Sequence, residues 1–276
     1  MIKRDTNKEY HSNSAVSKST LSNMSVNPAY YKWCLENPQP QTESMLFGSA
    51  VHKLILEEDD FDNEFVVIPT FNRKTKDGKI AYDMFVEKAK QENKSVITEE
   101  QYQTAKEMVE AVRKNRYANF IFGGEKEQSF YFTDDITHVE CKARPDCYVY
   151  KKGDNPRIII TDYKTCMKAD IRSIEKDVVA YSYDLQTYMY RLALSKEFGV
   201  PMENIDFLFM FQEKKAPYLI NLVQANEFVL QRGENLFREY INTLAYCIEN
   251  DNFYGYEGVS GEPCELSLPA YLLKTN

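Results

Sequence analysis

The sequence lacks the closely spaced cysteine pairs that metal–sulfur sites use. Its six cysteines stand singly along the chain, at Cys34, Cys141, Cys147, Cys166, Cys247 and Cys264. Zinc sites and iron–sulfur clusters normally take thiols only a few residues apart, so we expect no iron–sulfur cluster. Nothing in the sequence resembles a signal peptide, and disulfides persist mainly in oxidising compartments. We therefore expect a cytoplasmic protein with reduced thiols.

Three further absences narrow the class of protein. No apolar run approaches the roughly 18 residues that a membrane span needs, so we expect no membrane contact. Basic residues are not in excess: the sequence has 34 Lys and Arg against 42 Asp and Glu, which gives a net charge of −8. This excludes a protein that coats nucleic acid by charge alone. No Walker A motif is present, so a P-loop helicase would have to be a separate chain.

The sequence does contain enough apolar material for a large core, because 43% of its residues are hydrophobic. Periodicity predicts helices over 43–57, 80–91 and 98–114, then strands near 127–133, 138–150 and 157–163. It further predicts a long helix over 178–197, strands near 206–212 and 217–223, and a closing helix over 225–249. This order favours an α/β fold with a mixed central β-sheet flanked by helices.

We expect this fold to be a single domain over 1–276. Residues 1–15 are polar and are expected to be flexible. Residues 60–124 are predicted to be a helical insertion that covers the core. Residues 125–224 are predicted to hold the central sheet and the helix that carry the chemistry.

The most informative motif is Arg144-Pro145-Asp146, followed by Asp162-Tyr163-Lys164 at the end of an apolar strand pattern, Ile158-Ile159-Ile160. Residues two apart on a strand point to the same face, so Asp162 and Lys164 project together. A hairpin through a turn at 151–156 can bring Asp146 beside them. Two carboxylates and an ammonium at a strand end are suited to hold a divalent cation against a phosphodiester. The motif therefore predicts a metal-dependent nuclease.

The spacing of Asp162 and Lys164 is not specific by itself. The same acidic-x-lysine pattern occurs at Asp77/Lys79, Glu92/Lys94, Glu140/Lys142 and Glu213/Lys215. Asp162/Lys164 alone combines a preceding apolar strand, a paired Asp upstream and a helix downstream.

Two further side chains lie four residues apart on the predicted helix after Lys164. Gln186 and Tyr190 therefore share a face, from which an amide and a phenol can reach a phosphate or the attacking water. The alternative is an ordinary tyrosine-rich amphipathic helix whose rings belong to the core.

Three charged or titratable residues have two interpretations each. His52 on its apolar helix is either a metal ligand or a hydrogen-bonded core histidine. Glu127 either adds a carboxylate to the site or is solvated within the charged run 125–127. Arg144 either contacts a DNA phosphate or forms a salt bridge with a site carboxylate.

Together these residues resemble the PD-(D/E)XK nuclease superfamily. Within it they are similar to the phage recombination exonucleases of the RecE (exodeoxyribonuclease VIII), lambda-exonuclease and RecB-nuclease kind. Residues 47–52 match the G-x-A-x-H helix of that group, residues 142–146 its R-P-D strand and residues 162–165 its D-x-K-T strand. Gln186 with Tyr190 matches its Q-x-x-x-Y helix. The segments 9–11, 17–19 and 28–30 also resemble the RecE-like subgroup.

The resemblance implies a set of roles around Mg²⁺ or Mn²⁺. Asp146, Asp162 and the Tyr163 carbonyl would bind the metal, with His52 on the metal side and Glu127 as a further carboxylate. Lys164, Gln186 and Tyr190 would act with Asp146 and Asp162 in catalysis.

The resemblance also implies a biological setting. It implies 5′-to-3′ digestion of linear double-stranded DNA from its ends, by a ring-shaped homo-oligomer in a bacterial host cell. The remaining strand would pass to a RecT-like single-strand annealing protein during phage or prophage recombination. A PD-(D/E)XK endonuclease and a helicase-associated nuclease are alternatives. A non-catalytic DNA-binding homologue is a third alternative, against which the intact Asp146, Asp162 and Lys164 argue.

Overall fold

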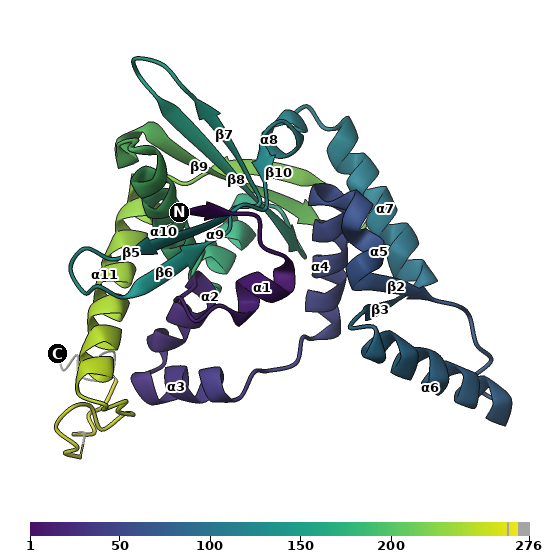
Figure 1. Cartoon of the computed structure of the whole chain (residues 1–276), viewed down its shortest axis with the longest axis horizontal. Coiled ribbons are helices and arrows are strands. Elements are labelled where there is room, and N and C mark those ends of the chain that lie inside the picture. Colours follow the sequence, from purple (N-terminus) through teal and green to yellow (C-terminus); the bar gives the residue numbers. More distant parts are fainter. Residues whose placement is uncertain (264, 270–276) are drawn as a thin grey trace, which may run out of the picture.

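A five-stranded mixed sheet forms the centre of the computed structural model, which describes residues 1–263 and 265–269 (Figure 1). Cys264 therefore lies outside the described residues. The strand order is β10-β9-β8-β7-β4, with bounds Ile220–Gln224, Ile205–Glu213, Arg157–Cys166, Cys147–Lys151 and Glu125–Lys126. Only the β8–β9 pair in this sheet is parallel. The predicted α/β fold with a mixed central sheet is confirmed.

The parallel pair β8–β9 is buried on both faces. On β9, Phe207, Phe209 and Phe211 alternate with Leu208 and Met210, and all five side chains are buried. The three phenylalanines pack in one apolar cluster, whereas Met210 belongs to a second cluster. A strand buried on both faces needs helices on both sides.

Helices supply both of those layers (Figure 1). On the phenylalanine side pack α10 (Tyr183–Phe198) and α11 (Glu227–Glu249). On the other side pack α4 (Glu43–Leu56) and α7 (Glu99–Lys114), with the short α8 (Asn119–Phe122) beside β7 and β8. The core therefore has two halves, separated by the central sheet.

The helix predicted over 178–197 is two helices. The first, α9, spans Ile171–Ala180, and α10 begins at Tyr183. Between them Ser182 adopts a left-handed backbone conformation with φ +51°, which an α-helix cannot contain. Together α9 and α10 form the crossover that a parallel strand pair requires. The 3₁₀ turn Met202–Asn204 then leads into β9.

The strand predicted over 138–150 is also divided. Its first part, β6 (Glu140–Ala143), joins β5 (Ser129–Thr133) and β1 (Ile2–Lys3) in a separate three-stranded sheet. Its second part is β7 of the central sheet. Pro145 lies at the break and has no N–H to donate to a ladder. The chain therefore changes sheets at Arg144-Pro145-Asp146.

The first fifteen residues, which the sequence suggests are flexible, are structured. β1 pairs with β5, and α1 (Asn7–Ser12) buries Tyr10. The ammonium of Lys142 donates to the carbonyls of Tyr10 and Asn13, at 2.6 and 2.7 Å. These two bonds fix the segment, and sequence periodicity could not reveal them. Three short helices follow, namely α2 (Lys18–Leu21), the 3₁₀ helix η1 (Ser22–Ser25) and α3 (Pro28–Glu36).

The segment 60–124 contains more than the helices that its sequence predicts. After η2 (Glu58–Asp60) come α5 (Phe61–Glu64), β2 (Phe65–Ile68), α6 (Lys76–Gln91) and β3 (Ser95–Thr98). β2 and β3 form a small parallel sheet, and α6 projects away from the rest of the chain (Figure 1). Among the helices that the structure describes, none has the length and hydropathy to cross a membrane.

Removal of one ring from the centre of β9 should unfold the protein at lower denaturant. Phe209 is only 2% exposed, so Phe209→Ala leaves a cavity and should lower the free energy of unfolding by about 3–5 kcal/mol. Urea titrations followed by circular dichroism measure this loss. The matched control is Phe228→Ala, whose ring is 82% exposed and should change stability by no more than about 0.5 kcal/mol. Equal midpoints for both variants would contradict the assigned core.

Candidate metal centre

The end of β8 carries two charged side chains that face the same side of the sheet. The ammonium of Lys164 lies 2.6 Å from Asp162 Oδ2. Tyr163, between them, points to the opposite side, where its hydroxyl donates to Gln212 Oε1 at 2.5 Å. The alternation predicted for this strand is therefore confirmed. Asp162 is 1% exposed.

Asp146 stands opposite Asp162 because β7 and β8 are antiparallel. Their first register pair is Cys147 with Thr161, and Asp146 directly precedes that pair. Its Oδ2 accepts a hydrogen bond from the Tyr163 backbone N–H at 2.6 Å. The hairpin thus fixes the second carboxylate at the same strand end, as its sequence predicts.

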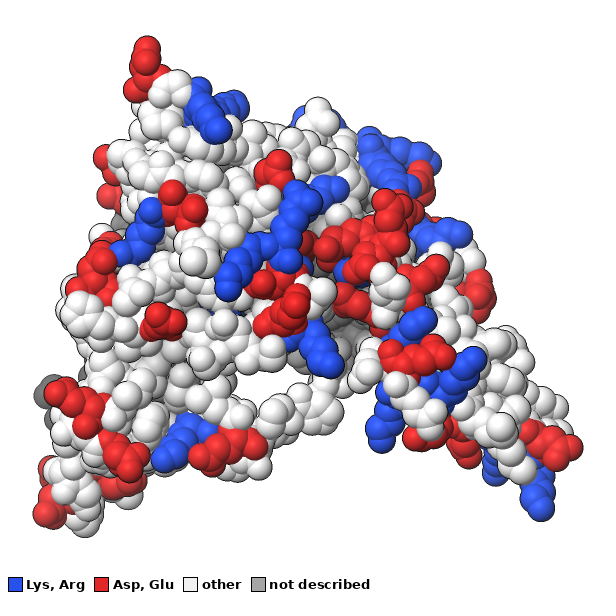
Figure 2. All heavy atoms as spheres, viewed as in Figure 1, with Lys and Arg blue, Asp and Glu red and all other residues white. Residues whose placement is uncertain are grey.

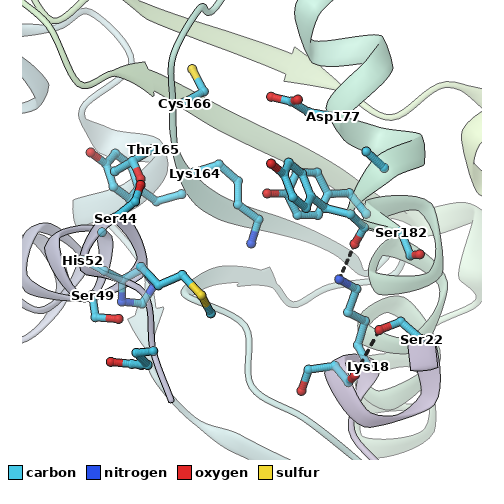
Figure 3. A pocket seen from close by; sticks show the side chains of 18 of the residues that line it. Lys18, Ser22, Ser44, Ser49, His52, Lys164, Thr165, Cys166, Asp177 and Ser182 are labelled. Atoms are coloured by element: carbon cyan, nitrogen blue, oxygen red, sulfur yellow. Dashed lines mark hydrogen bonds between the residues drawn. The ribbon is translucent and has the colours of Figure 1, made fainter. Parts of the chain in front are cut away.

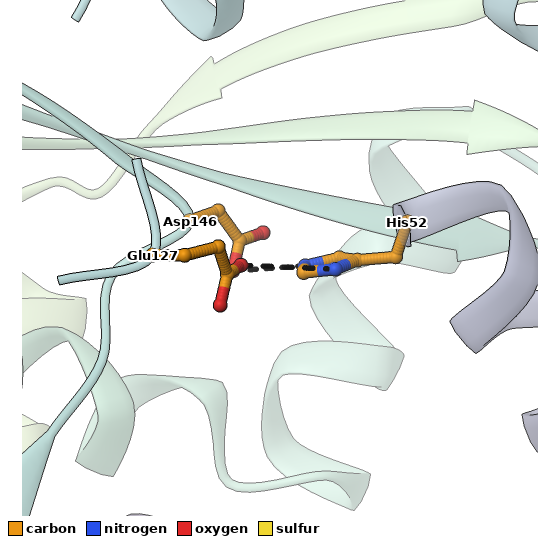
Figure 4. A group of neighbouring side chains, drawn as sticks. All are labelled: His52, Glu127 and Asp146. Atoms are coloured by element: carbon orange, nitrogen blue, oxygen red, sulfur yellow. Dashed lines mark ion pairs between the residues drawn. The ribbon is translucent and has the colours of Figure 1, made fainter. Parts of the chain in front are cut away.

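His52 reaches these carboxylates from α4, and a small residue on the same face allows the helix to approach β8. A Cβ added to Gly48, one turn earlier, would lie 3.2 Å from the Thr165 hydroxyl. His52 Nε2 lies 3.0 Å from Asp146 Oδ1, and its Nδ1 lies 3.8 Å from Glu127 Oε1 (Figure 4). The imidazole therefore contacts the carboxylates and is not merely a core histidine.

Glu127 lies on the connection between β4 and β5 and not on a strand. Its backbone is left-handed, with φ +51°, and its N–H donates to the Asp146 carbonyl at 3.3 Å. Arg144 pairs with its Oε2 at 2.7 Å and donates to its backbone carbonyl at 3.2 Å. Of the two interpretations of Arg144, the salt bridge is present in the structure, and the phosphate contact stays a prediction.

Gln186 and Tyr190 lie on the face of α10 that is turned toward the site. Gln186 Nε2 donates to Asp162 Oδ1 at 2.5 Å. The Tyr190 ring packs 6.2 Å from that of Phe207. Burial, Tyr10 and the carboxylates of the site raise the pKa of the Tyr190 hydroxyl well above its usual value. The phenol therefore lies within the field of the carboxylates and remains protonated.

Burial is the largest influence on the carboxylates of this site, and their mutual repulsion adds to it. Burial and the neighbouring Asp146 raise the pKa of Asp162 to about 6, and burial raises that of Glu127 to about 7. Burial alone would lower the pKa of His52, but Asp146 and Glu127 raise it to about 9. Burial opposes the charge on Lys164 too, yet Asp162 raises its pKa above the usual value. Two cationic side chains thus partly offset the carboxylates.

The donor set fits a divalent cation. Single ligand atoms of His52, Glu127 and Asp146 all lie within 4.8 Å of one another. Glu127 Oε1 is buried and accepts no hydrogen bond from the described residues, and His52 Nδ1 lies 3.8 Å from it. Buried carboxylate oxygens without donors are costly unless a cation compensates them. Asp162 is not a member of that three-residue group, and its carboxylate contacts Gln186 and Lys164. Its role as a ligand, and that of the Tyr163 carbonyl, stay predictions.

The site opens into a cleft of about 1260 Å³ between α4 on one side and α2 with the α9–α10 junction on the other (Figure 3). Lys164 projects into it, and Lys18 donates to the Tyr181 carbonyl at 2.5 Å. The ring of Tyr183 lies between both ammonium groups, 4.9 Å from Lys164 Nζ and 5.3 Å from Lys18 Nζ. Burial and Lys164 lower the pKa of Lys18 to about 7.

Sequence reasoning missed Lys18 and Tyr183 as parts of the site. The sequence presents Lys18 only within the segment 17–19 that resembles the RecE-like subgroup, and Tyr183 only within the tyrosine-rich helix predicted over 178–197. Their approach to Lys164 depends on how α2 packs beside the α9–α10 junction, for which the sequence offers no local signal.

Acidic side chains dominate the surface near α4 and α5, and basic side chains form no continuous face in the view of Figure 2. This matches the net charge of −8. Within the cleft, lysine side chains provide positive charge that could attract a polyanion.

Comparison with known proteins supports this picture of the fold. A candidate exonuclease from Eubacterium rectale has a crystal structure that matches with a TM-score of 0.60 and 14% identity, covering 99% of this chain and 98% of that one. The structure of SSO0001 matches with a TM-score of only 0.28 and 13% identity, over 75% and 83% of the two chains, and carries no argument. No curated protein is significantly similar in sequence. Residues 17–266 match the family described as "PDDEXK-like domain of unknown function (DUF3799)", and the chain therefore belongs to this family of the PD-(D/E)XK nuclease superfamily.

Proposed function

We propose that this protein is a Mg²⁺- or Mn²⁺-dependent DNA exonuclease that hydrolyses phosphodiester bonds of linear double-stranded DNA. The observation that carries the proposal is the Asp162–Lys164 pair beside the His52, Glu127 and Asp146 group. Membership of a PDDEXK-like family supports a nuclease. The Eubacterium rectale protein, described as a candidate exonuclease, supports the choice of exonuclease.

The residues of the site have separate tasks in this mechanism. His52, Glu127 and Asp146 would hold the cation, and the resemblance to PD-(D/E)XK nucleases adds the Asp162 carboxylate beside them. Such a cation polarises the phosphate and lowers the pKa of bound water. Lys164 stays protonated beside Asp162 and stabilises charge developing on the phosphoryl oxygens. Gln186 fixes the Asp162 carboxylate through its hydrogen bond, and the protonated Tyr190 phenol can donate to a phosphate or to the attacking water.

The finer biology follows from the resemblance to RecE-like exonucleases. We infer 5′-to-3′ digestion from DNA ends by a ring-shaped homo-oligomer, in the cytoplasm of a bacterial host. The remaining strand would pass to a RecT-like annealing protein during phage or prophage recombination. Arg144, already paired with Glu127, would contact DNA only if that salt bridge opens.

Loss of either charge at the end of β8 should abolish DNA digestion. Asp162→Ala and Lys164→Ala should each slow degradation of linear duplex DNA in Mg²⁺ by at least about 100-fold, because each removes stabilisation of the transition state. Release of acid-soluble nucleotide measures the rate. Asp77→Ala and Lys79→Ala are matched controls, since this pair has the same spacing but is exposed on α6. Digestion that continues unchanged in both site variants would refute the assignment.

An exonuclease needs a DNA end, whereas an endonuclease does not. We expect the wild type to consume a linearised plasmid and to leave the same plasmid intact when it is covalently closed. Agarose gels of parallel time courses give the result. Linearisation or relaxation of the closed circle at a similar rate would favour the endonuclease alternative.

A divalent cation should stabilise the folded chain independently of activity, because it binds the assembled carboxylates and not the unfolded chain. At 100 times its dissociation constant, an ion that binds only the folded state adds about 2.7 kcal/mol, or roughly 5–10 °C in melting temperature. Differential scanning fluorimetry with Mg²⁺ or Mn²⁺ measures the shift, which EDTA should reverse.

Variants of the ligands should lose this stabilisation. In Asp146→Asn and Glu127→Gln the shift should shrink to a small fraction, whereas Asp135→Asn should keep it, because the Asp135 side chain is 82% exposed and lies in a surface ion pair with Lys196. Equal shifts in all three variants would place the bound ion elsewhere.

A further inference from the structure

The cleft beside the metal centre is lined by exposed apolar side chains as well as by charge. Five of its lining residues are large, apolar and at least 39% exposed: Val26, Tyr30, Met45, Met167 and Tyr181. They come from three separate parts of the chain, the η1–α3 region, the start of α4 and the segment between β8 and α10. A set that converges from three directions on one cleft points to an apolar ligand surface.

The same cleft contains the cationic groups that a phosphate backbone needs. Besides Lys164 it is lined by Lys18, Lys168, Lys176 and Lys214. Apolar side chains interleaved with lysines in one groove are typical of proteins that bind single-stranded nucleic acid, where lysines follow the backbone and rings stack on bases. The surface in the view of Figure 2 is mixed or acidic, whereas the cleft gathers these lysines beside the candidate metal centre.

Tyr181 is the best placed of the apolar residues. Lys164 Nζ lies 4.9 Å from the centroid of the Tyr183 ring. The centroids of the Tyr183 and Tyr181 rings are 5.6 Å apart. The Tyr181 ring is 57% exposed in the cleft. Two neighbouring rings, Tyr183 and then Tyr181, therefore extend outward from the Lys164 ammonium, and the exposed Tyr181 ring is accessible to a DNA base.

We propose that the DNA strand in this cleft is unpaired, with its bases stacked on Tyr181 and packed against the other exposed apolar side chains. This inference rests on the proposed nuclease function and specifies its substrate. A paired duplex covers its base faces by stacking and presents phosphates and groove edges outward. Rings and methionines can contact base faces only where bases are unpaired or at a terminal pair.

The proposal makes the structure of the DNA end a determinant of rate. A blunt duplex must lose its terminal pairs before a strand enters the cleft, and unpairing costs free energy that a frayed or single-stranded end does not require. The decisive substrates are therefore a single strand, a blunt duplex and a duplex of the same length whose terminal pairs are mismatched at both ends. The symmetrical mismatches make the comparison independent of the polarity of digestion.

In single-turnover digestion with Mg²⁺, the wild type should cut the single strand and the mismatched end roughly tenfold or more faster than the blunt end. Tyr181→Ala should slow cutting of both unpaired substrates about tenfold, and Tyr181→Phe should restore it. The substitutions keep the backbone carbonyl to which Lys18 donates. Phe228→Ala, an exposed ring outside the cleft, should have no effect. Equal rates on blunt and mismatched ends, or unchanged cutting of unpaired ends by Tyr181→Ala, would overturn the proposal.

A binding assay separates this proposal from the nuclease assignment. With Ca²⁺ in place of Mg²⁺, stacking on Tyr181 should change the fluorescence of a single strand containing 2-aminopurine, and Tyr181→Ala should weaken binding about tenfold. If the wild type cuts none of the three substrates, the proposed nuclease function fails while this measurement still decides the inference. Binding of the single strand that is absent or equal in both proteins would overturn it.

Discussion

The rest of the site depends on one constraint, the burial of neighbouring carboxylates at one end of β8. Asp146 and Asp162 meet there because β7 and β8 pair in antiparallel register, and Glu127 approaches from the β4–β5 connection. Carboxylates this close cannot all remain charged without positive partners. The folded chain supplies His52 and Lys164, yet Glu127 Oε1 is buried and still accepts no hydrogen bond from the described residues. The remaining imbalance is what a bound divalent cation would remove.

The surrounding fold delivers these side chains from elements that the apolar core holds in place. The parallel ladder with β9 holds β8 laterally. The helix α10 packs on the phenylalanines of β9 and directs Gln186 at Asp162. On the opposite face α4 can approach β8 because Gly48 has no side chain, which brings His52 within reach. The charges themselves contribute little net stability, since desolvation consumes much of their attraction. The core therefore holds a site that the charges alone would not assemble.

Local patterns in the sequence predicted a large part of this arrangement. Alternation along 157–163 fixed the common face of Asp162 and Lys164, and the turn after β7 indicated the hairpin that positions Asp146. The same reasoning predicted a continuous strand through Pro145 and a continuous helix through Ser182, and both elements are interrupted there. Pro145 has no N–H for a ladder, and Ser182 adopts a left-handed backbone conformation. Sequence reasoning also missed the order in 1–15, which depends on Lys142 binding two distant carbonyls. Contacts between residues far apart in the chain leave no periodic signal, and Lys18 beside Tyr183 escaped for the same reason.

The acidity of the chain and the chemistry of its cleft are connected. A surface with a net charge of −8 repels a polyanion at long range, so nonspecific attraction cannot supply most of the affinity. The few lysines of the cleft act over short distances, and salt weakens their contribution. Contacts between exposed rings and bases do not depend on charge, and they require that the bases be accessible. If the proposed unpaired strand enters the cleft, an acidic protein with this site would gain its affinity where DNA has lost its pairing.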